Sequence, residues 1–198
     1  MRRQIIPHAI SAVALLTLGA SIPARAADNA AIKEKAAACA GCHGENGISQ
    51  TENIPSLAGQ PDQFLQWQLV FFRAGARKND QMQPIVEGIT NEDIRNFGAY
   101  FASLTPPKGP EDGDPDLSKK GAQVAVGRRC ASCHTDSYAG TKAVARLAGQ
   151  REEYLVKALH DYKAGQRVGG GVAAMADVAY HMSDEEITAV SHYLAHLK

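Results

Sequence analysis

Residues 39–43 read Cys-Ala-Gly-Cys-His, and residues 130–134 read Cys-Ala-Ser-Cys-His, 91 positions further along a chain of 198 residues. Three more landmarks recur in the same order at offsets of 90 to 93: Leu-Ala-Gly-Gln at 57–60 and 147–150, a methionine at 82 and 175, and an acidic helix start at 90–94 and 183–187. Four landmarks repeated in one order indicate a duplicated domain. Two long copies are too few for a solenoid.

The segment between the copies reads Thr-Pro-Pro-Lys-Gly-Pro-Glu-Asp-Gly-Asp-Pro over residues 105–115. Its prolines and glycines break helices and its acidic residues favour water, so it is interpreted as a linker. We predict an N-terminal domain at 27–104, a linker at 105–117 and a C-terminal domain at 118–198. Each copy is small for a self-sufficient apolar core, which favours a bound cofactor at its centre.

The first 26 residues predict a secretory signal peptide. Arg2 and Arg3 precede an apolar run over 10–20, and a small-residue pattern ends at Ala26. The run is shorter than the ~20 residues of a spanning helix, which disfavours a retained anchor. Export to the periplasm is therefore expected. Removing Arg2, Arg3 and Arg25 would leave 18 of the 21 basic residues against 21 acidic ones, a balance that gives no support for nucleic-acid binding.

The pattern of apolar residues predicts an all-α fold. Residues 30–38 are rich in Ala, Lys and Glu, and Pro61 suits the start of a helix. Thr90 and Ser183 are predicted N-caps, each followed three positions later by an acidic residue, with the better capping-box match at Ser183. In the second copy we expect helices over 118–128, 151–163 and 183–196. No segment alternates as a strand would.

The motif Cys-x-x-Cys-His is typical of covalent haem attachment. Its two thiols reach the two vinyl groups on one edge of a porphyrin, and the following histidine then lies beneath the ring as an axial iron ligand. We therefore predict two haem c groups. The predicted thioether and axial residues are Cys39, Cys42 and His43 for one haem, and Cys130, Cys133 and His134 for the other.

Two other uses of the cysteines are disfavoured. A thioredoxin-type disulfide does not explain two motifs that each precede a histidine, without a βαβ pattern. A zinc site of four cysteines would need the two pairs to meet, although they belong to separate copies.

A methionine opposite the axial histidine raises the reduction potential of a haem and suits electron transfer. Met82 precedes Pro84 in a predicted loop before the last helix of the first copy, and Met175 occupies the equivalent position in the second. We predict these two as sixth ligands. Met182 matches Ile89 in the repeat and is expected to pack at the start of the last helix, although it stays open as an alternative to Met175. The weaker alternatives are His160 and His181.

His192 and His196 lie four positions apart on the last predicted helix, a spacing that suits a metal ion. The sequence offers no third ligand nearby, so we interpret them as a solvated face. Three basic residues, Arg73, Arg77 and Lys78, either attract an acidic partner or belong to an ordinary solvated surface.

These residues resemble the cytochrome c4 family over essentially all of the chain that follows the signal peptide. The resemblance is carried by residues 39–44, residues 54–60, Met82 with Pro84, the capped last helix and their repeats. It implies two class I cytochrome c domains related by a pseudo-twofold axis, each wrapped around a covalently attached haem. It also implies electron delivery from a quinol-cytochrome c reductase towards a terminal oxidase. Association with the membrane surface is left open.

The second copy departs from the family pattern. In that pattern a proline carbonyl accepts a hydrogen bond from the axial histidine; Pro55 matches it, whereas the second copy has Ala145. We expect His134 to be held less firmly, although any residue supplies a carbonyl. The glycines at 169–171 should also loosen the loop before Met175. A weaker methionine bond is thus expected at the second haem.

The predicted function is single-electron transfer rather than catalysis. A catalytic haem requires an open sixth position, and each copy carries a candidate methionine for it. The alternative is a haem c subunit of a periplasmic dehydrogenase, such as a flavocytochrome. A haem-based sensor would need a signalling domain, and none is recognised in the sequence.

Overall fold

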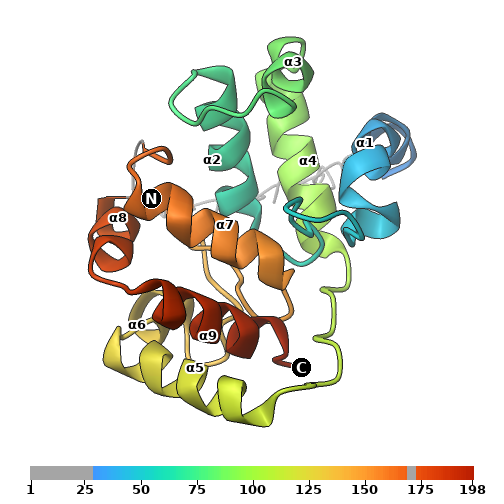
Figure 1. Ribbon diagram of the computed structural model, residues 1–198. Coiled ribbons are helices and arrows are strands. Elements are labelled where there is room, and N and C mark those ends of the chain that lie inside the picture. Colours follow the sequence, from blue (N-terminus) through green and yellow to red (C-terminus); the bar gives the residue numbers. More distant parts are fainter. Residues whose placement is uncertain (1–28, 169–172) are drawn as a thin grey trace, which may run out of the picture.

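The computed structural model describes residues 29–168 and 173–198 (Figure 1). All regular elements in these residues are helices, apart from two isolated β-bridges. The prediction of an all-α fold is confirmed. The first-half elements are α1 (Asn29–His43), the 3₁₀ helix η1 (Glu45–Gly47), α2 (Asp62–Arg73), α3 (Met82–Glu87) and α4 (Asn91–Ser103). The second-half elements are α5 (Pro115–Gly127), α6 (Ala131–His134), α7 (Glu152–Lys163), α8 (Ala173–Tyr180) and α9 (Asp184–Ala195).

The helices of the first half lie above those of the second half in Figure 1, and the segment between α4 and α5 runs down one side of the molecule. Helix α5 begins at Pro115, within the segment predicted as linker. The side chain of Asp114 accepts a hydrogen bond from the backbone N–H of Leu117, and Pro115 takes the first helical turn, where its missing N–H costs nothing.

Both predicted capping boxes are present. Thr90 Oγ1 accepts from the N–H of Asp93, and the Asp93 carboxylate accepts from the N–H of Thr90. Ser183 and Glu186 make the same pair of bonds at the start of α9. The match at Thr90 was expected to be looser, yet its aspartate reaches back as the longer glutamate does. The two caps fix equivalent helices, α4 and α9, in the two halves.

Each half has its own apolar core. The core of the first half contains Ala36, Leu65 and Phe101, and the core of the second contains Leu155, Ile187 and Leu194. Helices α5 and α9 cross closely at Gly121, where an added Cβ would lie 2.0 Å from the carbonyl oxygen of Ala189. No helix among residues 29–168 and 173–198 has both the length and the apolarity needed to cross a bilayer.

The boundary between the halves is held by two equivalent glutamines. Gln60 donates to the carbonyl of Arg146 and accepts from its N–H. Gln150 does the same to the backbone of Ser56. Because residues 60 and 150, and residues 56 and 146, each differ by 90 positions, the contacts obey the pseudo-twofold symmetry that the resemblance implied.

Candidate haem-binding cavity

One continuous cavity of about 900 Å³ lies between the halves. It is lined by both Cys-x-x-Cys-His motifs and by apolar side chains of α2, α4, α7 and α9. All eight predicted site residues lie on its wall: Cys39, Cys42, His43, Met82, Cys130, Cys133, His134 and Met175. A cavity of this size between two small helical domains fits the expectation that a cofactor takes the place of part of each apolar core.

His43 ends α1 and is buried beside the cavity. Its Nδ1–H donates to the carbonyl oxygen of Pro55 at 2.8 Å. The bond fixes the tautomer and leaves the Nε2 lone pair free, which is how proteins orient metal-binding imidazoles. Burial lowers the pKa of His43, which keeps the imidazole in the neutral form that binds metal ions.

His134 repeats this arrangement in the second half. It is buried at the end of α6, and its Nδ1–H donates to the carbonyl oxygen of Ala145 at 2.8 Å. The replacement of proline by alanine therefore does not lengthen the bond, because the acceptor belongs to the backbone. Burial lowers the pKa of His134 as it does that of His43. The glycines at 169–171, expected to loosen the second ligand loop, lie outside the described residues.

No disulfide joins any of the four cysteines. Cys39 and Cys130 are half-buried, and burial raises the pKa of both thiols. The two pairs line the same cavity but stand in separate halves, each pair directly before its histidine. This placement fits thioether attachment to two porphyrins.

The candidate methionines differ in setting from the sequence expectation. Met82 opens α3 rather than lying in a loop, and the side chain of Asn79, in the turn before the helix, accepts from the Met82 N–H at 2.9 Å. Met175 lies in α8 and is half-buried. Met182 is 4% exposed and packs in the core of the second half, as expected, although it also reaches the cavity wall.

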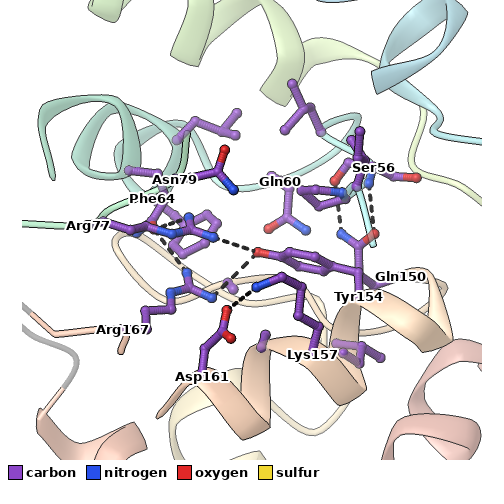
Figure 2. Close-up of a pocket in the computed structure, with 18 of the residues that line it drawn as sticks. Ser56, Gln60, Phe64, Arg77, Asn79, Gln150, Tyr154, Lys157, Asp161 and Arg167 are labelled. Carbon is purple, nitrogen blue, oxygen red and sulfur yellow. Dashed lines mark hydrogen bonds and ion pairs between the residues drawn. The ribbon is translucent and has the colours of Figure 1, made fainter. Parts of the chain in front are cut away.

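Two arginines at equivalent positions meet where the halves join (Figure 2). Arg77 and Arg167 form an isolated antiparallel bridge, and both donate to Gln68 Oε1, at 2.7 and 2.9 Å. Both also donate to the hydroxyl of Tyr154. Each guanidinium lies over an aromatic ring, that of Phe72 or Tyr162. Arg77 is therefore part of the interior, which corrects its interpretation as a surface residue.

The two guanidiniums are positively charged, and no ion pair neutralises either of them in the described residues. Neither arginine forms an ion pair with any residue in the part of the chain that the structure describes, and Nε of Arg167 is buried without a partner. Burial alone would raise the pKa of Tyr154, but the two guanidiniums outweigh it and lower that pKa to about 8. Buried cations require a counter-ion. The propionate groups of haem have this charge, so the cavity fits haem in its thiols, imidazoles and charge.

A duplicated helical fold with one haem-attachment motif per half, both facing a shared cavity, defines a dihaem c-type cytochrome. Residues 30–105 and 118–198 each match the protein family described as Cytochrome c. Cytochrome c4 of Pseudomonas aeruginosa is 35% identical, over 91% of this chain and 94% of that protein. The thiosulfate dehydrogenase electron acceptor of Thiomonas intermedia is 32% identical, over 98% of this chain and 93% of that protein.

A solved structure agrees with these relatives. Reduced recombinant cytochrome c4 from Pseudomonas stutzeri superimposes with a TM-score of 0.80 at 31% identity, covering 86% of this chain and 99% of that chain. The chain belongs to the cytochrome c4 family. It is an electron-transfer protein rather than an enzyme, and it carries two covalently bound haem c groups.

Sequence reasoning missed several residues of this cavity, above all Arg167, Gln68 and Tyr154. A signal existed for one of them: Arg77 and Arg167 differ by 90 positions, the offset of the repeated Leu-Ala-Gly-Gln element. Gln68 has no such signal, because its equivalent in the second copy is Ala158.

Proposed function

We propose that this chain carries single electrons between redox proteins of the periplasm. The observation that carries the proposal is that each motif histidine is buried with Nδ1 bonded to a backbone carbonyl, so that Nε2 is the atom left to bind iron. In this proposal His43 and Met82 ligate the first iron, and His134 and Met175 the second. Cys39, Cys42, Cys130 and Cys133 form the thioethers.

The residues around the iron sites hold the ligands in place rather than react. The carbonyls of Pro55 and Ala145 orient the imidazoles and increase their basicity. Thioether sulfurs of methionine at the sixth position favour ferrous iron and exclude substrates. The bound haem supplies a reversible one-electron change between ferrous and ferric iron.

The domain organisation follows from the same features. We place a cleaved signal peptide at 1–26, one haem domain at 27–104, a linker at 105–117 and the second haem domain at 118–198. The reciprocal bonds of Gln60 and Gln150 support a fixed relation between the two domains. A fixed relation would hold the two bound haems at a constant separation, which would suit electron exchange within one chain.

The proposed partners are a quinol-cytochrome c reductase as donor and a terminal oxidase as acceptor. A second candidate donor is a periplasmic dehydrogenase, because a relative that matches 98% of this chain is named a thiosulfate dehydrogenase electron acceptor. The residues described here bind haem in either case. The two candidate donors are therefore distinguished by the rate at which each reduces the protein.

Stopped-flow mixing distinguishes the donors. The oxidised, haem-loaded protein is mixed with membranes that oxidise quinol, and separately with thiosulfate dehydrogenase and thiosulfate, while the α-band of ferrous haem is followed. Fast reduction of both haems by quinol-oxidising membranes, followed by oxidation by a terminal oxidase, is the expected result. Reduction by the dehydrogenase alone would favour the second donor. Failure of both donors would contradict the carrier function.

A further inference from the structure

Three potential metal ligands converge outside the haem cavity. Asp112 belongs to the segment between the halves. His192 lies in the last turn of α9, and His196, one turn later, is its C-cap. One donor atom of each residue lies within 4.8 Å of those of the other two. His192 is only 8% exposed, so the interpretation of this helix face as solvated is wrong for it. The third ligand that the sequence did not offer comes from Asp112, 80 positions earlier.

Each histidine is oriented by a hydrogen bond at its other nitrogen. Nδ1 of His192 lies 3.0 Å from Oε2 of Glu152 on α7. Nδ1–H of His196 donates to the backbone carbonyl of His192 at 2.8 Å. Nε2 of His196 is thereby left for a further partner, and Nε2 of His192 faces the carboxylate of Asp112. Metal-binding histidines in proteins are typically held in this way, by a carboxylate or a carbonyl on the distal nitrogen.

We propose that Asp112, His192 and His196 bind one divalent transition-metal ion, with zinc as the best match. Two imidazoles and one carboxylate are ligands that suit zinc and copper more than calcium or magnesium, which prefer oxygen alone. Three protein ligands leave the fourth tetrahedral position to water. Glu152 is a positioning residue for His192 and does not contact the ion.

The separation between the donor atoms of His192 and Asp112 is close to what such a site requires. Nε2 of His192 and Oδ1 of Asp112 lie 3.0 Å apart and share a proton. Metal–ligand bonds of about 2.0–2.1 Å at tetrahedral angles separate two ligand atoms by roughly 3.3 Å. For this pair an opening of a few tenths of an ångström therefore suffices, whereas the donor atom of His196, within 4.8 Å of the other two, would have to approach them. The shared proton leaves to solvent as the metal takes its place, and no redox step is involved.

The bound ion would fasten the connection between the domains. Asp112 lies in that connection, between α4 and α5, whereas His192 lies in the last turn of α9 and His196 is its C-cap. The connection already touches this end of the chain through a hydrogen bond from Gly109 N–H to the Leu197 carbonyl. A metal ion bound here restrains the connection, and it acts independently of the two irons.

Equilibrium dialysis against zinc chloride tests the proposal on the haem-loaded protein, with zinc and iron counted by atomic emission. We expect one zinc per two irons in the wild type. His196→Gln and Asp112→Asn should each weaken zinc binding at least 10-fold, and Glu152→Gln should weaken it roughly 10- to 100-fold. His181→Gln is the matched control, because His181 is an exposed histidine whose ring lies against Tyr180 and near Asp177, away from Asp112 and His196. Its zinc binding should equal that of the wild type.

A thermal measurement supplies the second readout. Zinc should raise the unfolding temperature of the wild type and of His181→Gln, but not that of Asp112→Asn. Asp112 is exposed in the connection, so this variant is expected to fold and to bind both haems. The proposal is overturned if the wild type retains no zinc, or if Asp112→Asn and His196→Gln retain zinc as tightly as the control.

Discussion

Arg77 and Arg167 meet across the two halves of the molecule and donate to the same two acceptors, Gln68 and Tyr154 (Figure 2). Both arginines line the cavity that would hold the two haems. No carboxylate in the described residues lies within ion-pair distance of either guanidinium, so the pair is expected to act on the bound haems electrostatically.

Removing one of these charges should lower the reduction potential of the haems. A buried cation favours ferrous over ferric iron. A unit charge about 10 Å from iron at an effective ε of about 20 contributes about 1.7 kcal/mol, or about 70 mV for one electron. We expect Arg167→Gln to lower at least one potential by tens of millivolts in a spectroelectrochemical titration. Arg73→Gln is the control, because Arg73 is exposed. Equal shifts in the two variants would contradict the role of the pair.

The two methionines near the second haem should behave differently. Met175→Leu should open the sixth position of one haem, which then binds carbon monoxide in the ferrous state. Met182→Leu should leave the haem spectrum unchanged and cost less than about 1.5 kcal/mol, because it exchanges similar volumes in a packed core. Optical spectra of both variants check this. The assignment fails if Met182→Leu is the variant that opens the site.

Thr135 is a candidate for stabilisation by substitution. It follows His134 with φ 70° and ψ 161°, a region that favours glycine, and its equivalent in the first copy is Gly44. A threonine in this conformation destabilises the folded state by roughly 1–3 kcal/mol. Replacing it with glycine removes that strain, but glycine loses more conformational entropy on folding, which offsets roughly 0.5–1 kcal/mol of the gain.

We expect Thr135→Gly to raise the free energy of unfolding by about 1 kcal/mol in denaturant titrations. Gly44→Ala should do the opposite, because its Cβ would lie 1.9 Å from the Ile48 carbonyl oxygen. Destabilisation by Thr135→Gly would show that the threonine is not strained.

The capping box of α4 should contribute stability that depends on pH. Bonds from Lys35 and Thr90 lower the pKa of Asp93 to about 2 from 3.8. The contribution is therefore present above about pH 4 and is lost as the pH falls towards 2.

Asp93→Asn should cost about 1 kcal/mol at pH 7, mostly through the cap, because an ion pair with an exposed lysine adds little. The gap between variant and wild type in unfolding free energy should narrow at pH 2–3. A gap that stays constant with pH would contradict the lowered pKa.

The features predicted from sequence are those that depend on neighbours in the chain. The haem motifs are five residues long, and the caps at Thr90 and Ser183 join residues three apart. The repeat then placed the same features twice. Each of these patterns lies within a few consecutive residues, so the sequence shows it directly.

The features that sequence reasoning missed join distant residues. Asp112 reaches His192 only because the connection folds back along α9, and nothing near either residue indicates this. Arg77 was assigned to the surface because its burial depends on Tyr154 and Arg167 from the other half. Met82 opens a helix of only six residues, which is too short to show a clear apolar period in the sequence.

The central claim is that both irons are six-coordinate, with a histidine and a methionine each. Its most direct test is the optical spectrum of the ferrous, haem-loaded protein before and after carbon monoxide is added. The account predicts no change in the spectrum of either haem. A shift of part of the haem signal would show that one sixth position is open, which would contradict the assignment of the carrier and point first to Met175.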